Sequence, residues 1–152
     1  MSRRFQSIRA RSSRGFTLIE TMIAVGIAGV LSSVAYPSFE AHILRARRTD
    51  AMVTLMQAQL AEERFRANNA SYGSLAEIGM RSASMSGYYS LEIRGNATEA
   101  YEVVAAASGA QAHDVACRTL RLAQSSQGLV FASGPDAAAS NPAEVNRKCW
   151  NQ

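Results

Sequence analysis

The sequence predicts an α+β fold in which one long N-terminal α-helix packs on a four-stranded antiparallel β-sheet. Three observations lead to this prediction. An apolar run over 16–36 leads into a second stretch with helical periodicity. After Gly87 the period of the apolar residues changes to two, which is typical of half-buried strands. Two cysteines, Cys117 and Cys149, enclose the C-terminal span of a small globular region.

The first 15 residues carry the excess positive charge of this 152-residue chain, whose formal net charge is +4. They contain no acid and five of the 16 basic residues, namely Arg3, Arg4, Arg9, Arg11 and Arg14. Subtracting these 5 from 16 leaves 11 bases against 12 acids, a net charge of −1. The basic character therefore belongs to this leader and does not by itself indicate a nucleic-acid-binding domain.

The segment 16–36 has the length of a membrane span. Its 21 residues are apolar or small except for Thr17, Thr21 and one charge, Glu20. As a helix with a rise of ~1.5 Å per residue it is ~31 Å long, close to the ~30 Å of a bilayer core. The basic leader orients the chain with its N-terminus inside and its bulk outside. The apolar part is too long for an ordinary secretory signal peptide, and no Ala-x-Ala site interrupts it.

Pro37 ends the apolar run and predicts a kink or a brief break in the helix. Helical periodicity then resumes to about residue 67, and Asn68-Asn69 supplies a stop. The predicted helix therefore has a hydrophobic half, 16–37, and an amphipathic half, 38–67. The apolar positions that outline one side of the second half are Phe39, Ile43, Met52, Leu55, Met56, Leu60 and Phe65.

The globular β domain is expected over 68–152. Residues 68–86 are predicted to connect helix and sheet, with a short helical possibility at 75–78. Strands are predicted at 89–93, from Tyr101, at 119–122 and at 129–131, with turns at Gly95-Asn96 and Gly128. Residues 133–148 are expected to form a loop.

The spacing of Cys117 and Cys149 matches neither a zinc site nor a CxxC redox motif. In an oxidising compartment they would form one disulfide, which closes a loop of about 33 residues and stabilises the fold by roughly 3–4 kcal/mol. The alternative is two unrelated buried thiols. A globular region of this size gains much from a covalent link.

The segment Arg14-Gly15-Phe16-Thr17-Leu18-Ile19-Glu20, followed at once by the apolar run, resembles the class III signal of type IV prepilins. Pro37 and the C-terminal cysteine pair agree with that family. The resemblance implies the type IV pilin fold, in which a disulfide closes the C-terminal loop. It also implies that a prepilin peptidase removes residues 1–15 by cleaving between Gly15 and Phe16, and that the new Phe16 amine is N-methylated.

The same resemblance implies a location and partners. The precursor would be a single-pass inner-membrane protein with a periplasmic C-terminal domain, and the mature subunit would lie in a pilus at the cell surface. Its implied partners are other pilin subunits, the prepilin peptidase and the inner-membrane assembly machinery, and no cofactor is implied. In such filaments the helix between Gly29 and Pro37 is often partly unwound.

Glu20 is the informative residue of the apolar segment. A carboxylate at mid-bilayer costs about 2.5–3.5 kcal/mol, so it usually has a partner. We predict that Glu20 pairs with the Phe16 amine of an adjacent subunit and sets the axial register. Alternatively, it lies near the membrane interface or contacts its own helix N-terminus. The small residues predicted to let neighbouring helices approach, unless they reflect only ordinary membrane-helix composition, are Ala24, Gly26, Ala28 and Gly29.

Other functional classes find little support in the sequence. His42 and His113 are the only histidines, and no HExxH, GxSxG or P-loop motif is present, so neither an enzyme nor a metal site is predicted. A DNA-binding uptake pilin is the alternative suggested by a basic cluster of Arg45, Arg47 and Arg48. Such a cluster is more often a solvated face or an intersubunit ion pair.

Within the family, the disulfide loop favours a pilus subunit over a type II secretion pseudopilin. The strand that begins at Tyr88-Tyr89 and the short Cys117 loop resemble minor, assembly-priming subunits more than a major pilin. We therefore expect a minor pilin that acts in assembly, within a system that serves adhesion, twitching motility or DNA uptake.

Overall fold

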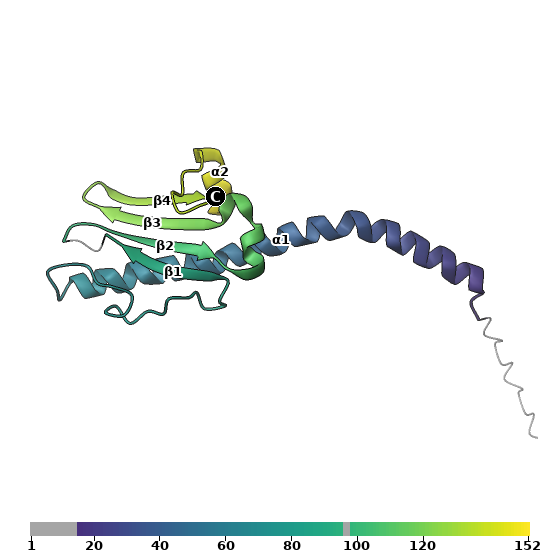
Figure 1. Cartoon of the computed structure of the whole chain (residues 1–152), viewed down its shortest axis with the longest axis horizontal. Coiled ribbons are helices and arrows are strands. Elements are labelled where there is room, and N and C mark those ends of the chain that lie inside the picture. Colours follow the sequence, from purple (N-terminus) through teal and green to yellow (C-terminus); the bar gives the residue numbers. More distant parts are fainter. Residues whose placement is uncertain (1–14, 96–97) are drawn as a thin grey trace, which may run out of the picture. The chain divides into compact units, whose positions relative to one another are not determined.

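The computed structural model describes residues 15–95 and 98–152 (Figure 1). In chain order its elements are α1 (Leu18–Arg66), β1 (Tyr89–Arg94), β2 (Tyr101–Ala107), the short 3-10 helices η1 (Gly109–His113) and η2 (Val115–Cys117), β3 (Thr119–Ser125), β4 (Gly128–Gly134) and α2 (Ala143–Cys149). The boundary between two compact units, Met1–Ser38 and Phe39–Gln152, falls within α1. Apart from Gly15, the predicted leader lies outside the described residues, as does Asn96 of the predicted turn.

Helix α1 begins and ends within two residues of its predicted bounds. At its C-terminal end the side-chain amides of Asn68 and Asn69 donate to the carbonyls of Arg64 and Phe65, and the Asn68 backbone N–H also donates to the Phe65 carbonyl. The helix is continuous through Pro37, so the predicted brief break is absent, and the alternative of a kink stays a prediction. Proline removes one helical hydrogen bond, and the long helical runs on both sides are sufficient to continue the helix past it.

The four strands form one antiparallel sheet in the order β1-β2-β3-β4, as predicted (Figure 1). In the registers of the sheet Leu91 lies opposite Ala105, and Ala105 lies opposite Leu120. Strands β3 and β4 extend beyond their predicted bounds, to 119–125 and 128–134. Their extra residues are polar or small, so hydrophobic alternation could not indicate them, whereas pairing in the ladder holds them.

The core lies between the sheet and the second half of α1. Helix residues Ala51, Leu55 and Ala58 are fully buried, and they face a sheet surface made of Tyr89, Leu91, Tyr101, Val103, Leu120 and Leu122. The predicted apolar side of this half was partly wrong, because Phe39, Met56 and Leu60 are 64%, 51% and 53% exposed. The small alanines let the helix approach the sheet closely, so they occupy the buried side in place of larger residues.

The C-terminal region corrects the prediction of a loop over 133–148, because it contains helix α2. Pro142 stands at the start of α2, where the missing N–H of proline is not needed. Glu144 in the first turn and Lys148 in the last are 2.8 Å apart and also complement the helix dipole. The short helical possibility at 75–78 was wrong as well, because that segment forms hydrogen-bonded turns.

Candidate functional site

The first candidate surface is the apolar part of α1 in the unit that ends at Ser38. Its large apolar side chains are all at least 57% exposed, from Leu18 at 82% to Ile23 and Ile27 at 57%. Helix α1 holds a stretch long and apolar enough to cross a membrane, and none of that stretch is buried within the structure. A helix that is apolar on all sides needs lipid or other helices around it.

The predicted packing residues of this segment lie open to their surroundings. A side chain added at Gly26 or Gly29 would meet nothing within 4 Å. Ala24 and Ala28 are exposed on the same helix. Because no partner chain is present, their role in helix packing stays a prediction.

Glu20 and Thr17 form a reciprocal pair at the start of α1. The backbone N–H of Glu20 donates to Thr17 Oγ1 at 3.3 Å, and the N–H of Thr17 donates to Glu20 Oε2 at 3.4 Å. This arrangement is a capping box, which satisfies two backbone donors at a helix N-terminus. In the single chain Glu20 therefore contacts its own helix end, as one of the sequence alternatives proposed. Pairing with a neighbouring subunit stays a prediction.

The predicted cleavage position lies just before this capping box. Gly15, Phe16 and Thr17 are exposed and lie outside any helix or strand. A Cβ added at Gly15 would have no neighbouring atom within 4 Å. Exposed, irregular backbone is the kind of segment that proteases cleave. The geometry is thus compatible with cleavage between Gly15 and Phe16.

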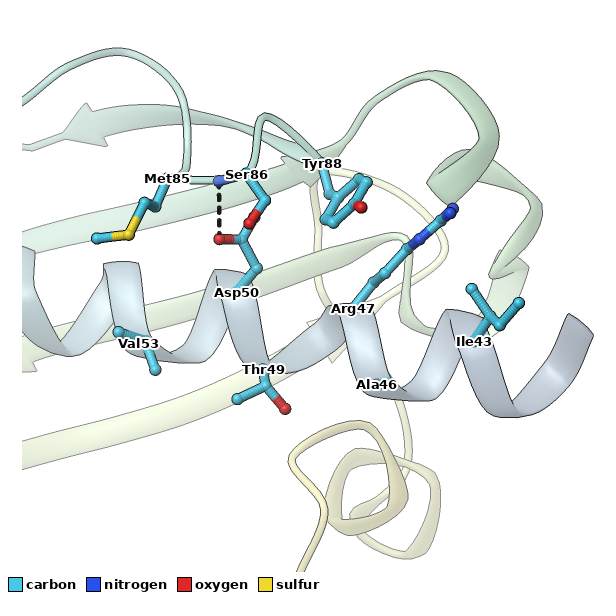
Figure 2. A pocket seen from close by; sticks show the side chains of 9 residues that line it. All are labelled: Ile43, Ala46, Arg47, Thr49, Asp50, Val53, Met85, Ser86 and Tyr88. Carbon is cyan, nitrogen blue, oxygen red and sulfur yellow. Dashed lines mark hydrogen bonds between the residues drawn. The ribbon is translucent and has the colours of Figure 1, made fainter.

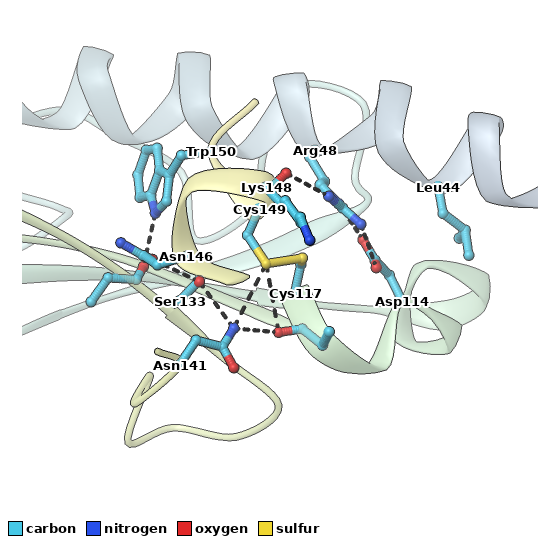
Figure 3. Close-up of a disulfide and its surroundings, with 12 residues drawn as sticks. Leu44, Arg48, Asp114, Cys117, Ser133, Asn141, Asn146, Lys148, Cys149 and Trp150 are labelled. Atoms are coloured by element: carbon cyan, nitrogen blue, oxygen red, sulfur yellow. Dashed lines mark hydrogen bonds and ion pairs between the residues drawn. A yellow bond between two sulfur atoms is a disulfide. The ribbon is translucent and has the colours of Figure 1, made fainter. Parts of the chain in front are cut away.

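The C-terminal cysteines form the predicted disulfide between Cys117 and Cys149 (Figure 3). Both residues are buried, and the bond joins η2 to the end of α2. The side-chain amide of Asn141 donates to the Ala116 carbonyl at 2.7 Å and lies 3.7 Å from Cys149 Sγ. The disulfide thus holds the C-terminal region against the sheet.

The arginine cluster predicted on α1 is divided among three surroundings. Arg48 is nearly buried and forms an ion pair with Asp114, with Nε 2.6 Å from Oδ2. The Arg47 guanidinium lies over the Tyr88 ring, 4.5 Å from its centre. Arg45 is exposed and lines a shallow depression with Lys148, Asn151 and Gln152. The three therefore do not form one basic patch, and the Arg48 pair lies within the chain rather than between subunits.

Other basic residues on or next to the sheet also form contacts within the chain. Arg121 on β3 lies 3.3 Å from Glu102 on β2, and Arg118 donates to the Ala112 carbonyl at 3.1 Å. His113 ends η1, and its Nδ1 lies 3.9 Å from Glu40 Oε1. In residues 15–95 and 98–152 no group of three His, Cys, Asp or Glu side chains is placed to hold a metal ion.

A buried polar network that sequence patterns did not indicate lies beside the Arg48 pair. The Gln111 side-chain amide donates to Tyr89 Oη at 3.0 Å and to the Leu44 carbonyl at 3.1 Å. Burial raises the pKa of Tyr89 to about 12, so this phenol is neutral at physiological pH. The network links η1 to both the helix and β1, and no local motif in the sequence marks its members.

Figure 2 shows a second feature that the sequence did not indicate, an open groove of about 440 Å³ between α1 and the segment before β1. Ile43, Val53 and Met85 supply apolar walls, and Arg47 lies against Tyr88 at one end. The Ser86 N–H donates to Asp50 Oδ1 at 3.1 Å across it. These residues lie far apart in the sequence, so only the fold brings them together.

Two parts of the chain match known protein families. Residues 37–121, more than half of the chain, match the family described as "Type IV minor pilin ComP, DNA uptake sequence receptor". Residues 10–36 match the prokaryotic N-terminal methylation motif, a range that includes Gly15, Phe16 and Glu20. The chain belongs to the type IV pilin family, in the group represented by this minor pilin.

Individual relatives agree with that family. The chain is 38% identical over 68 residues to the type IV major pilin protein PilA of Myxococcus xanthus. The aligned stretch covers 44% of this chain and 31% of the relative. It is 30% identical over 91 residues to a fimbrial protein of Neisseria meningitidis serogroup B, covering 59% of this chain and 49% of the relative. The chain thus matches about a third to a half of the length of these relatives.

Proposed function

We propose that this chain is a minor subunit of a type IV pilus, which is made as a membrane-inserted precursor and packs into the filament through residues 16–37. The observation that carries the proposal is the exposed apolar half of α1, most of which lies within the match to the methylation motif. Burying it stabilises the assembled state, because about 25 cal/mol is gained for each Å² of apolar surface removed from water. A bilayer serves the same purpose before assembly.

The proposed precursor has four parts. Residues 1–15 form the leader that a prepilin peptidase removes, and residues 16–37 form the membrane-spanning and filament-core half of the helix. Residues 38–67 form the amphipathic half, and residues 68–152 form the exported β domain. The buried disulfide supports an exported domain, because disulfides persist in oxidising compartments. The basic leader supports the inside location of the N-terminus.

Glu20 acts in this proposal as the register residue of the filament. Cleavage after Gly15 creates a positively charged amine on Phe16, and N-methylation leaves that charge in place. Within one helix the amine and Glu20 are about one turn apart, ~6 Å, whereas a neighbouring amine is free to approach more closely. The capping box supports a two-step role, in which Thr17 holds the Glu20 carboxylate until a neighbouring amine replaces the weaker contact.

The role proposed is structural, not catalytic. Its partners would be other pilin subunits, the prepilin peptidase and the inner-membrane assembly machinery. The exposed stripe on the second half of α1, formed by Phe39, Val53, Met56 and Leu60, supports contacts between subunits as well, because monomeric proteins rarely leave such a stripe uncovered.

Copy number and orientation test this function. We expect quantitative mass spectrometry of sheared filaments to find this subunit at a small fraction of the main pilin, and protease added to spheroplasts to degrade the β domain. If the chain were the most abundant filament protein, the minor role would be wrong. If it were absent from filaments and protected in spheroplasts, the whole proposal would fail.

DNA uptake is the second candidate function, and the description of the matching family as a DNA uptake sequence receptor favours it. Arg45 and Lys148 are exposed and line one depression, where Lys148 Nζ also lies 2.8 Å from Glu144 Oε1. The affinity for DNA falls as salt rises, and each lost phosphate contact makes the slope of log affinity against log salt less steep by about 0.9. We expect R45A/K148A in the full chain to reduce that slope in duplex DNA binding, and R64A/R81A, which removes the same charge elsewhere, to leave it unchanged. Equal slopes for both variants would contradict this site.

A further inference from the structure

A buried carboxyl group lies near the C-terminal end of α1, away from every surface discussed above. Glu62 is 0% exposed. Its Oε2 accepts a hydrogen bond of 2.9 Å from the Gly73 N–H, whereas its Oε1 is buried with no partner among the described residues. A carboxylate that is buried with only one donor is expensive to keep ionised.

The side chains around Glu62 are aromatic or negatively charged. Tyr101 of β2 is 2% exposed, and its hydroxyl group also has no partner within the part of the chain that the structure describes. The rings of Tyr72 and Tyr101 lie 4.5 Å apart. The negative charges of Glu63 on α1 and Glu77 on the following segment act on Glu62. The Arg66 guanidinium lies over the Tyr72 ring, 5.9 Å from its centre.

Glu62 fastens the segment 67–80 to the helix at a close contact. A Cβ at Gly73 would lie 3.0 Å from Ile78 Cγ2 and 3.1 Å from Phe65 Cε1, so a larger residue would have to displace these side chains. The hydrogen bond between Gly73 and Glu62 is the buried polar link between this segment and α1.

We propose that Glu62 is a proton-dependent anchor, which holds the segment 67–80 on α1 when the carboxyl group is protonated and releases it when the group is ionised. In the neutral form one oxygen accepts from the Gly73 N–H, and the proton leaves the buried carboxyl group without charge. In the ionised form the second oxygen holds uncompensated charge away from water. Opening the segment hydrates that charge.

The direction of the pKa shift supports this device. Burial raises the pKa of Glu62 above its usual range, the Gly73 N–H opposes the rise, and the charges of Glu63 and Glu77 add to it. The anchored state thus binds the proton more tightly than the open state. Anchoring is strongest below the ordinary glutamate pKa and weakens as the pH rises through the raised value.

Hydrogen exchange of the full chain in detergent micelles tests the proposal. The protection factor of the Gly73 amide, corrected for the intrinsic exchange rate, is measured from acidic to neutral pH. We expect it to fall tenfold for each unit by which the pKa of the anchored state exceeds that of the open state. E62Q, which keeps an acceptor oxygen and adds a neutral donor, should give constant protection. E63Q makes the same charge change at an exposed neighbouring position, and it should keep the part of the fall that comes from burial and lose only the smaller part that the Glu63 charge adds.

Two results would overturn the anchor. One is a wild-type protection factor that does not change with pH, and the other is an E62Q variant that shows the same fall as the wild type. If E62Q does not fold, carboxyl carbon NMR of wild-type Glu62 decides the question, because a titration midpoint at or below the ordinary glutamate value contradicts the proposal and a raised midpoint supports it. None of these measurements depends on whether the chain assembles into filaments.

Discussion

Arg48 and Asp114, 66 positions apart in the chain, form a two-point ion pair between α1 and the turn that links η1 to η2 (Figure 3). Arg48 Nε and Nη2 lie 2.6 Å and 2.8 Å from the two Asp114 oxygens, and Nη1 donates to the Lys148 carbonyl at 3.0 Å. Asp114 shortly precedes Cys117, and Lys148 directly precedes Cys149. One helix side chain therefore holds both segments that the disulfide joins.

Truncating Arg48 should destabilise the β domain. Its side chain is 12% exposed and that of Asp114 is 8%, and breaking such a pair leaves a buried charge unpaired, which costs about 3–5 kcal/mol. We expect R48A to lower the free energy of unfolding by this amount. Trp150, the single tryptophan and 5% exposed, reports the transition by fluorescence.

A double-mutant cycle separates this pair from other effects. R48A/D114A should be less destabilised than the sum of its two single variants, because the double variant leaves no unpaired charge. R121A, which removes an arginine from the half-exposed pair with Glu102, is the matched control and should lose less stability. Strictly additive losses at Arg48 and Asp114 would show that the pair is not coupled.

Removing the disulfide should weaken the same region. C117S/C149S is expected to lower the free energy of unfolding by roughly 2–4 kcal/mol, because the unfolded chain gains the entropy of an open loop. Reduction of the wild type by a thiol should give a similar loss and should not affect the double variant. An unfolding midpoint that is the same in all four samples would contradict a stabilising role for the disulfide.

The sequence predicted the local secondary structure of the chain better than the contacts between distant residues. Alternation at Tyr89 and Leu91 predicted β1, and the apolar run predicted α1 nearly to the residue, because both signals are local. The Arg48 to Asp114 pair could not be predicted, because it joins a helix surface to a 3-10 segment that has no periodic pattern. Helix α2 was missed because Pro142 suggested a loop, whereas proline is also favoured at the first positions of a helix.

Replacing Glu20 should separate processing from assembly. E20A and E20Q keep the residues on both sides of the Gly15–Phe16 bond, so we expect cleavage to be largely intact and incorporation into filaments to fall strongly. Immunoblots of membrane and sheared-filament fractions measure both steps. The matched control is E40Q, an exposed acid on the same helix. Normal incorporation of E20A and E20Q would contradict a register role.

The stability of the folded chain should carry a pH dependence from Glu62. Its pKa is raised in the folded state, so it favours folding below its unfolded pKa, and this contribution is lost as the pH rises through the folded value. From acidic to neutral pH, the unfolding free energy of the wild type should therefore fall relative to that of E62Q. Chemical unfolding followed at Trp150 measures it, and a difference that does not vary with pH would contradict the shift.

The candidate surfaces were predictable to different degrees. The motif from Gly15 to Glu20 is contiguous, so the sequence alone indicated the methylation and cleavage region. The capping box with Thr17 was one of several options for Glu20, because the sequence does not say which donor a carboxylate will use. The arginines on α1 looked like one cluster in the sequence, but successive positions on a helix point in different directions, and the fold assigns each a separate neighbour.

The mass of the N-terminal peptide from sheared surface filaments tests the central claim most directly. The account predicts a mature chain that begins at N-methylated Phe16, recovered in filaments alongside other pilin subunits. A chain recovered only outside filaments, with its arginine-rich first 15 residues still attached, would contradict it.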